Sequence, residues 1–434
     1  MTLLQHSTDP YCACSLYGAA LTIAGIHNTA MIVHGPQGCE VSASAAYSYQ
    51  NVDYTGKLIA CTKLSEVDVV TGGEIKLSNT LKKLAATYDP ELLVILAGCA
   101  PEIIGDDVLS VSGHIEEETG IPVVPITVGG FRGSEHVGID LALQMLIEKL
   151  AIPQEKTSES SVNLVAPFAS SNPGWMGDLG WVKEILAALG IRINAVLCSD
   201  TTVSDIERVG RAEATLLLTH NAGYTPCTMI EERYDVPFIL KELPLPIGLH
   251  CTRQWIEALG TYFDREEKAS DIIEKGEQEV VDTLRLRFIP IHWFHEHPTV
   301  IVGDLTNSIG LLDFITRELE MDPLAVCVRK ATRDARPILE SVVKDLGISP
   351  LIEYDADIAT VRSVLQEVRP MSVFGSLVEK HLCKQMGIKV VYRLFNPIDR
   401  VDYFNYPLMG HEGLLKILEF TINNWRNSAT EGFK

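Results

Sequence analysis

The sequence predicts an α/β protein made of three Rossmann-like domains, each a parallel sheet flanked by helices. Short runs of strand-forming residues alternate with helical stretches along all 434 residues, which is the pattern of parallel sheets covered by helices. The alternation is interrupted at the polar segment 151–162 and at the segment PIHWFHEHP (290–298), and it restarts after each. We therefore expect domains at residues 1–155, 156–296 and 297–434.

Each expected domain has its own strands and helices. Strands are expected where apolar and β-branched residues form short continuous runs, and helices where apolar residues recur with a helical period. The expected strands are residues 31–34, 92–96, 123–128, then 163–168, 193–197, 214–220, 237–243, then 299–304, 324–330, 350–356, 371–376 and 389–395. The expected helices are residues 16–26, 76–88, 136–150, then 181–189, 228–234, 271–286, then 309–319, 335–346, 358–368 and 377–386.

Composition and charge exclude several classes of protein. The formal net charge is -21 and the isoelectric point is near 5.0, which argues against nucleic acid as a partner, because phosphate backbones attract basic surfaces. No apolar run reaches the ~18 residues of a membrane span. The first residues also lack the basic start and apolar core of a secretory signal. We expect a cytoplasmic protein that binds neither nucleic acid nor a membrane.

Three cysteines lie where elements are expected to end. Cys39 follows the strand 31–34 through a Gly-Pro-Gln-Gly turn, Cys99 follows the strand 92–96, and Cys14 precedes a small apolar helix. Ligands of parallel sheets bind beyond the carboxyl ends of strands, and helix N-termini stabilise thiolates. Without a fourth cysteine nearby, these three do not complete a tetrahedral site for one metal ion. They suit a metal–sulfur cluster that another chain completes.

The other cysteines have the sequence environment of small buried residues. The chain has 10 cysteines but no CxxC pair, which argues against zinc-ribbon, thioredoxin and ferredoxin-type sites. Cysteine is often simply a small apolar core residue. That role is expected for Cys198, Cys251, Cys327 and Cys383. It is also favoured for Cys61, although the sequence leaves open whether Cys61 or Cys12 joins the cluster. Cys227, before an expected helix, is the best candidate for a separate ligand.

Polar residues near the three cysteines have two possible roles. His34, beside the Gly-Pro turn, could bind metal, but a histidine in this position more often orients the loop through hydrogen bonds. Asp106 and Asp107 could also be ligands, and we favour helix polarity and capping for both. We find no Ser/His/Asp set and no pair of carboxylates suited to acid–base catalysis in the sequence.

Four motifs resemble the nitrogenase component 1 superfamily. They are CSLYGAA, VHGPQGC, TGGEIKL and GCAPEIIGDDV, and Cys39 follows Cys14 by 25 positions, a spacing familiar in that family. The segments ELPLPIGLHCT (242–252) and FNPIDRVDYFNYPLMGHEGLLKIL (395–418) resemble β-type subunits. The resemblance covers nearly the whole chain, and its first cysteine block is highly specific.

The resemblance implies a cluster shared between two subunits. In the family, α and β chains with three Rossmann-like domains form an α2β2 heterotetramer. Each contributes three cysteines to an 8Fe-7S P-cluster, and Cys14, Cys39 and Cys99 match the β-type set by position. An ATP-hydrolysing iron protein with a 4Fe-4S cluster delivers the electrons. The nitrogenase-type active-site cofactor is held in the α subunit by a cysteine and a histidine, and the matching segments here lack them: residues 218–221 contain no cysteine, and residues 393–395 contain no histidine. The resemblance therefore implies a β-type electron-relay subunit.

Departures from the nitrogenase pattern direct the choice of activity. The chain begins almost at the first cysteine motif, and residues 129–134 read GGFRGS where nitrogenase β chains have SFVGS. Gly130 has no side chain, so it cannot supply the ligand that a serine of the SFVGS motif could supply. The leading expectation is a nitrogenase-like methylthio-alkane reductase, which cleaves C–S bonds of small methylthio compounds. The alternatives are a nitrogenase β subunit proper, a non-catalytic scaffold for cofactor assembly and, less favoured, a tetrapyrrole reductase relative.

Overall fold

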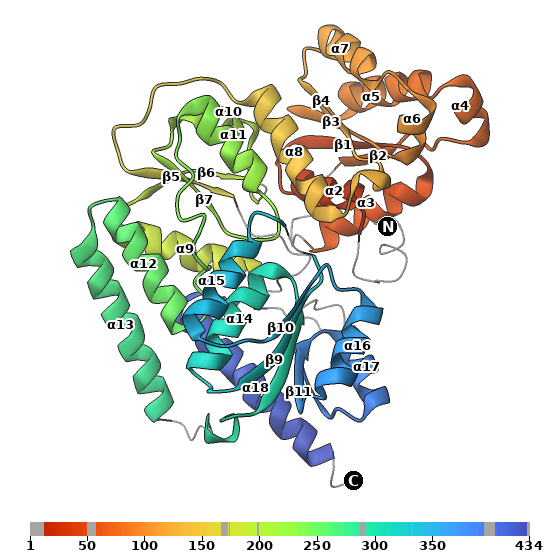
Figure 1. The fold of residues 1–434 in the computed structure, drawn as a ribbon. Helices are drawn as coiled ribbons and strands as arrows, with labels where there is room; N and C mark the ends of the chain where they lie inside the picture. Colours follow the sequence, from red (N-terminus) through yellow and green to blue (C-terminus); the bar gives the residue numbers. More distant parts are fainter. Residues whose placement is uncertain are drawn as a thin grey trace. The chain divides into compact units, whose positions relative to one another are not determined.

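The computed structural model contains three parallel β-sheets with helices packed on their faces (Figure 1), which confirms the predicted fold class. It describes residues 13–49, 58–165, 172, 174–197, 199–286, 291–330, 332–394 and 404–431. By its internal contacts the chain forms two compact units. Unit 1 contains residues 1–166, 193–217 and 222–239, and unit 2 contains residues 167–192, 218–221 and 240–434. In the described parts, no helix has the length and apolar character to cross a membrane.

The first sheet of unit 1 has four parallel strands in the order β2-β1-β3-β4. Its strands are β1 (Thr29–His34), β2 (Leu58–Cys61), β3 (Leu92–Ala97) and β4 (Val123–Thr127). Every residue of the two central strands is buried, because helices cover both faces of the sheet. Val33 pairs with Leu96 and with Cys61, so these three strands end at one edge of the sheet. Strand β2 was not predicted from the sequence.

Seven α-helices of the described chain accompany this sheet. They are α2 (Ser15–Ala24), α3 (Gln37–Tyr49), α4 (Glu66–Thr71), α5 (Glu74–Tyr88), α6 (Cys99–Ile104), α7 (Val108–Thr119) and α8 (Glu135–Leu150). The expected helices 16–26, 76–88 and 136–150 correspond to α2, α5 and α8. Helices α2 and α8 pack backbone against backbone: a Cβ on Gly18 would lie 1.8 Å from the carbonyl oxygen of Glu135, and one on Gly138 would lie 1.8 Å from that of Ser15. Larger residues at either glycine would force the two helices apart.

The second sheet of unit 1 has three strands in the order β6-β5-β7. They are β5 (Ser161–Val165), β6 (Arg192–Leu197) and β7 (Ala214–Leu217), with α10 (Val203–Glu207), η3 (Val209–Arg211) and α11 (Tyr224–Tyr234) beside them. The predicted strand 237–243 is wrong. Only Phe238 forms an isolated bridge, to Thr215, and Leu240 then adopts a left-handed backbone with a φ of 57° that ends the extended course.

Unit 2 contains a five-stranded sheet in the order β10-β9-β8-β11-β12. Its strands are β8 (Pro298–Gly303), β9 (Asp322–Val328), β10 (Leu351–Tyr354), β11 (Ser372–Gly375) and β12 (Val390–Arg393). Four helices connect them: α14 (Leu305–Arg317), α15 (Arg336–Leu346), α16 (Ile358–Val368) and α17 (Leu377–Met386). All five strands and all four helices were predicted, and α16 and α17 have the predicted bounds.

The other helices of unit 2 were only partly predicted. They are α9 (Trp175–Leu189), α12 (Leu249–Tyr262), α13 (Glu266–Arg285), the short η4 (Ile291–Trp293) and α18 (Gly410–Glu431). Helices α12 and α18 were not predicted, although α12 buries a stripe at helical spacing that includes Trp255, Ile256 and Leu259. Each of the three sheets lies inside one expected domain range, but the domain boundaries themselves stay a prediction.

Candidate functional site

Cys14 is fixed at the start of α2 by the segment that follows β4. It is the N-cap residue of α2 and forms an isolated antiparallel bridge with Ser134. The next residue, Ser15, donates its hydroxyl hydrogen bond to the carbonyl oxygens of Val128 at 3.1 Å and Gly129 at 2.9 Å. These contacts tie the first cysteine to the loop 128–134, which was singled out in the sequence only for its departure from the family pattern.

Cys99 is the first residue of α6, directly after β3. The backbone N–H of Gly130 donates a hydrogen bond to the Cys99 Sγ at 3.0 Å. A Cβ on Gly130 would lie 3.4 Å from the Cys14 Cβ and 3.5 Å from the Cys99 Sγ. Gly130 therefore contacts two of the three predicted cysteines. Its role as a backbone donor was missed from the sequence, where only the lack of a side chain was noticed.

Cys39 lies in the first turn of α3, after the turn that begins at Gly35. Its backbone N–H donates to the carbonyl oxygen of Pro36 at 3.1 Å. Cys61, the last residue of β2, lies nearby: its thiol donates to the carbonyl oxygen of Gly35 at 3.4 Å and accepts from the N–H of Lys63 at 3.3 Å. Cys61 is half-buried rather than fully buried. Cys12 lies outside the described residues.

The three predicted cysteines gather in one part of unit 1. Cys39 and Cys14 are half-buried and Cys99 is exposed. Burial raises the pKa of the Cys39 thiol, and the negative charges of Cys99, Cys14 and Cys61, as thiolates, raise it further. The Cys39 proton is held until a cation takes its place, and thiol ligands release protons when metal binds.

His34 holds the ends of β1 and β2 to the turn after α6. It is fully buried, with Nδ1 at 3.0 Å from the Thr62 Oγ1 and Nε2 at 3.0 Å from an oxygen of Asp106. The Thr62 hydroxyl accepts from the N–H of Gly35 at 3.1 Å, and Asp106 accepts from the N–H of Gly73 at 2.9 Å. Burial lowers the pKa of His34 although Asp106 opposes it, so the imidazole is neutral near pH 7. This geometry gives His34 the loop-orienting role favoured from the sequence.

The two aspartates after α6 have different roles. Asp107 is the N-cap of α7 and accepts from the N–H of Ser110 at 2.9 Å, which is the predicted capping. Asp106 does not cap that helix. It accepts from His34 and Gly73 instead, and a Cβ on Gly73 would lie 2.6 Å from its carboxylate and 2.9 Å from the His34 ring. The glycine leaves the space that this buried network occupies.

The remaining described cysteines lie in the core. Cys227, Cys251, Cys327 and Cys383 are all fully buried. Cys227 is inside α11 rather than before it, and burial raises its pKa well above the usual value. Burial likewise raises the pKa of Cys327 and of Cys383 to about 12. Cys198 lies outside the described residues.

The donor set fits an iron–sulfur cluster better than a single metal ion. Nowhere in the described residues do three His, Cys, Asp or Glu side chains converge as one ion requires. The thiols are instead spread over the starts of α2, α3 and α6, with glycines at positions 35, 38, 98 and 130 beside them. Soft thiolate ligands suit iron–sulfur clusters, and glycine lets backbone approach a bulky inorganic group. Cys14, Cys39 and Cys99 stay the predicted ligands of such a group.

Comparison with known proteins identifies the class and then the family. The solved structure of nitrogenase Cp1 at pH 6.5 superposes with a TM-score of 0.81 over 97% of this chain and 93% of that chain, at 20% sequence identity, so the fold is that of a nitrogenase component. The family model for nitrogenase component 1 type oxidoreductase matches residues 14–426. The chain belongs to the nitrogenase component 1 type oxidoreductase family.

Relatives within the family include chains of different roles. The nitrogenase molybdenum-iron protein beta chain of Methanococcus maripaludis is 25% identical over 96% of this chain and 93% of that one. The nitrogenase iron-molybdenum cofactor biosynthesis protein NifE of Sinorhizobium fredii is 27% identical over 76% of this chain and 67% of that one. Alpha chains of molybdenum-iron proteins match as well. The family rests on the match to the family model, and identity of 24–27% leaves the role of this chain to its own residues.

Residues 218–221, which contain no cysteine, are held by hydrogen bonds to residues around the start of α14. Within unit 2, the N–H of His220 donates to the Thr306 Oγ1 at 2.7 Å, and the Asn221 side chain donates to Asp304 at 2.9 Å. Burial lowers the pKa of His220 to about 4, so the ring is neutral. Residues 218–221 are thus occupied by contacts with the start of α14 and contain no thiol. Of the second segment, Phe395 lies outside the described residues.

Proposed function

We propose that this chain is the β-type, P-cluster-binding electron-relay subunit of a nitrogenase-like, ATP-dependent reductase. Cys14, Cys39 and Cys99 would hold one side of an 8Fe-7S P-cluster, and an α-type subunit in an α2β2 heterotetramer would hold the other. When bound, such a cluster supplies storage for low-potential electrons. The observation that carries this proposal is the placement of three thiols at three helix starts in unit 1, with Gly130 against two of them.

The chain's own residues set the conditions for electron transfer. The N–H of Gly130 donates to the Cys99 Sγ at 3.0 Å, and hydrogen bonds to cluster sulfur are one of the factors that set a reduction potential. The buried network of His34, Thr62 and Asp106 fixes the loop that leads to Cys39. When the ligands are held rigidly, little structural reorganisation accompanies electron transfer. These residues therefore position the ligands and take no direct part in the reaction.

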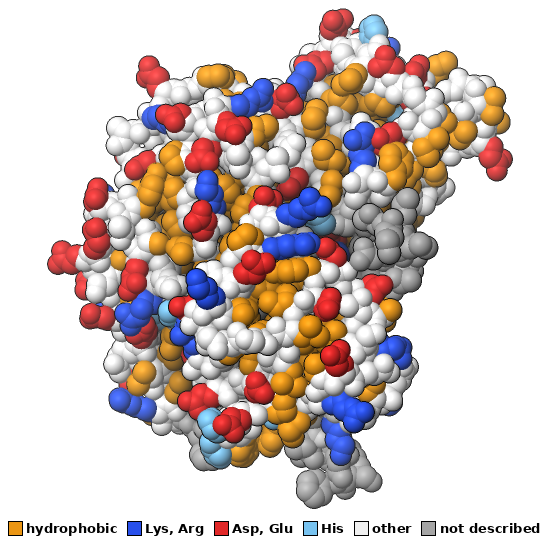
Figure 2. Space-filling model, in the orientation of Figure 1, with side chains coloured by type: hydrophobic (Ala, Val, Ile, Leu, Met, Phe, Trp, Pro, Cys, Tyr) orange, Lys and Arg blue, Asp and Glu red, His pale blue; other side chains and the backbone are white. Residues whose placement is uncertain are grey.

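Exposed apolar side chains beside the thiols support the proposed protein partners. Val41 on α3 is 64% exposed and Ile103 on α6 is 74% exposed, and the first turn of each helix contains a proposed ligand. Val67 and Val70 on α4 are 68% and 86% exposed. Figure 2 shows hydrophobic side chains gathered over this part of unit 1. Apolar groups exposed together mark interaction surfaces, and we assign the α3 and α6 side to the α-type subunit and α4 to the ATP-hydrolysing 4Fe-4S iron protein.

For the reaction we propose the reductive cleavage of C–S bonds in small methylthio compounds. Two electrons and two protons convert such a bond into a C–H bond and an S–H bond. The nitrogenase-type cofactor for this step is assigned to the α subunit, because residues 218–221 and 393–395 contain neither cysteine nor the matching histidine. The departure of residues 129–134 from SFVGS supports this activity over a nitrogenase proper. The free thiols of the described chain suit the cytoplasm.

A turnover assay tests the activity. The complex with its α-type partner is supplied with the iron protein, ATP and a reductant, and gas chromatography follows methane from dimethyl sulfide. We expect methane formation that depends on ATP and exceeds ammonium formation from dinitrogen. Ammonium as the main product would contradict the substrate proposal and favour a nitrogenase β subunit proper.

The second candidate is a non-catalytic scaffold for cofactor assembly. The similarity to NifE and the GFRG sequence at residues 130–133 favour it. It predicts no turnover of dimethyl sulfide or dinitrogen, together with transfer of a cofactor from the purified complex to an apo-reductase. The same preparation distinguishes the two functions, because only the scaffold restores activity to another enzyme.

A further inference from the structure

The loop 128–134 places the backbone N–H of Gly130 at 3.0 Å from the Cys99 Sγ. Ser15 of α2 fixes both ends of this loop: its hydroxyl donates to two carbonyl oxygens at the start of the loop, and its backbone N–H donates to the carbonyl oxygen of Gly133 at 3.1 Å. Gly130 lies between these anchors, at the start of the short η2. A separate contact joins this middle part of the loop to α6, the helix that begins with Cys99.

That contact is an ion pair between Arg132 and Glu102. The Nη2 of Arg132 lies 2.5 Å from the Oε1 of Glu102, with 42% of the arginine side chain and 17% of the glutamate side chain exposed. Arg132 comes two residues after Gly130 in the loop, and Glu102 comes three residues after Cys99 in α6. The ion pair therefore joins the same two elements as the hydrogen bond from the Gly130 N–H to the Cys99 Sγ.

The second oxygen of the Glu102 carboxylate lies against the start of the loop. A Cβ on Gly129 would lie 2.5 Å from this Oε2, so a larger residue there would push the carboxylate out of its place. The Oε2 is buried and has no hydrogen-bond partner within the described residues. A buried acceptor without a donor lowers stability, so stability alone does not explain why Glu102 is placed here.

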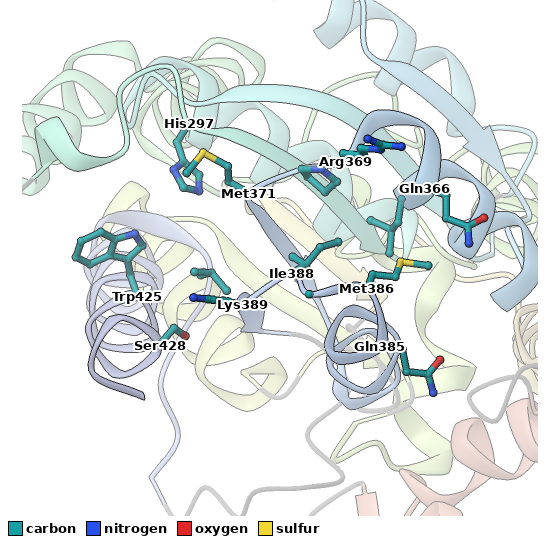
Figure 3. A pocket seen from close by; sticks show the side chains of 14 residues that line it. His297, Gln366, Arg369, Met371, Gln385, Met386, Ile388, Lys389, Trp425 and Ser428 are labelled. Atoms are coloured by element: carbon teal, nitrogen blue, oxygen red, sulfur yellow. The ribbon is translucent and has the colours of Figure 1, made fainter. Parts of the chain in front are cut away.

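Two cations of unit 2 show that a cation on this chain is not automatically paired with an acid. Arg369 and Lys389 line a depression of about 1010 Å³, and both residues are exposed. Figure 3 shows them at different ends of the depression, with their side chains pointing apart. None of its described lining residues is an aspartate or glutamate. Arg132 differs from both, because its guanidinium lies on a mostly buried carboxylate.

We propose that Glu102 and Arg132 are a positioning pair, which holds the N–H of Gly130 on the sulfur of Cys99 and thereby sets the reduction potential of the cluster. This inference rests on the proposed function, because it needs a cluster at Cys99. A hydrogen bond to a ligand sulfur stabilises the more negative, reduced state of a cluster, so it raises the midpoint potential. Without the ion pair the middle of the loop is released from α6, the hydrogen bond weakens and the midpoint potential falls.

A redox titration followed by electron paramagnetic resonance, on the full chain in complex with its α-type partner, tests the pair. Glu102→Gln removes a negative charge and Arg132→Gln removes a positive one. If the two residues acted only through their charges, the midpoint would rise in the first variant and fall in the second. A positioning pair instead lowers the midpoint in both variants. We expect the ratio of reduced to oxidised cluster at a fixed potential to fall about five- to tenfold, where tenfold is about 59 mV for a one-electron couple.

Two further variants serve as controls. Arg132→Lys keeps a cation opposite Glu102 and should restore most of the midpoint potential. Lys149→Gln breaks another ion pair of unit 1, in which the Lys149 Nζ lies 2.8 Å from Glu116 with similar exposure, and it should leave the midpoint unchanged. Iron content and melting temperature should stay close to those of the unchanged complex in all four variants.

Three results would overturn the inference: midpoints that shift in opposite directions in Glu102→Gln and Arg132→Gln, midpoints that do not shift although iron is fully bound, or loss of iron from both variants. The last result would mean that the pair holds the ligands themselves in place and does not adjust the potential. An unchanged complex that binds no iron would instead refute the proposed function, so the two failures are distinguishable.

Discussion

The first sheet of unit 1 and the sheet of unit 2 use cysteine in opposite ways. In unit 1, Cys14, Cys39 and Cys99 lie at the starts of helices, half-buried or exposed, and Cys39 and Cys99 lie where the chain leaves the sheet. In unit 2, Cys327 lies within β9 and Cys383 within α17, both fully buried in one apolar cluster. The sheets are alike in strand direction and helix cover, so the position along each element decides what a thiol can do.

The cysteines of the two sheets differ in how accessible their thiols are as well as in the chemistry of their surroundings. Cys327, inside a strand, and Cys383, inside a helix, lie in an apolar cluster, and burial raises the pKa of both thiols to about 12. A thiol at a helix start lies beside glycines and backbone N–H groups, as Cys99 does beside Gly130. Substitutions at the two kinds of position test this contrast, because they should affect either iron binding or core packing.

The largest effect is expected from the proposed ligands. Cys39→Ala and Cys99→Ala each remove a thiolate from the cluster, so the iron content of the complex with its α-type partner should fall to a small fraction of the unchanged protein. Loss of metal also removes its contribution to folding, and the heterodimer should dissociate more readily. Iron analysis together with analytical ultracentrifugation measures both quantities. Full iron content in both variants would contradict the proposal that Cys39 and Cys99 bind iron.

The buried network is expected to rank next. Asp106→Ala leaves the His34 Nε2 and the Gly73 N–H without their partner in the interior, at roughly 1–3 kcal/mol for each unsatisfied group. The free energy of unfolding should therefore fall by about 2–5 kcal/mol, measured by urea denaturation. Asp107→Ala, which removes only the cap of α7, is the matched control and should cost about 1 kcal/mol. Equal losses in the two variants would contradict the network.

A core cysteine should affect stability and not iron. Cys327→Ala removes one buried sulfur from β9, and an ordinary core change of this size costs about 1 kcal/mol. The iron content should match that of the unchanged complex. If Cys327→Ala lowers iron as much as Cys39→Ala does, the sheet of unit 2 takes part in metal binding and the comparison fails.

The smallest effect on stability is expected at Gly130. A Cβ there meets Cys14 and Cys99 at ordinary contact distances of 3.4 and 3.5 Å, so Gly130→Ala should change the free energy of unfolding by less than about 0.5 kcal/mol. It adds a methyl group beside two proposed ligands, so iron content or the redox midpoint should change. Gly113→Ala on α7, with open space around it, is the control for iron content and the redox midpoint. A Gly130→Ala complex with unaltered iron and midpoint would place the cluster elsewhere.

Much of the fold and part of the site could be predicted from sequence, for physical reasons that differ between elements. Buried strands such as β3 are short, continuous apolar runs, which is the pattern expected of a strand in a parallel sheet. Helix α16 has apolar residues at helical spacing, between an Asp N-cap and a polar C-terminal end. Strand β2 has four residues, all half-buried, and too weak a pattern to be recognised. The run 237–243 is apolar, but the turn at Leu240 depends on tertiary contacts.

The candidate site likewise has parts that the sequence could predict and parts that it could not. The cysteines could be found because strand ends and glycines mark them in the sequence. The network of His34, Thr62 and Asp106 joins residues that are distant in sequence, so only the assembled sheet brings them together. The N–H of Gly130 has no sequence signal at all, because a backbone donor is available at nearly every residue.

Anomalous diffraction at the iron edge tests the central claim most directly, on crystals of the chain with its α-type partner grown without oxygen. The account predicts an iron density maximum within bonding distance of the thiols of Cys14, Cys39 and Cys99, between the two subunits. Iron bound elsewhere, with these three thiols free in a complex that is fully loaded with metal, would contradict it.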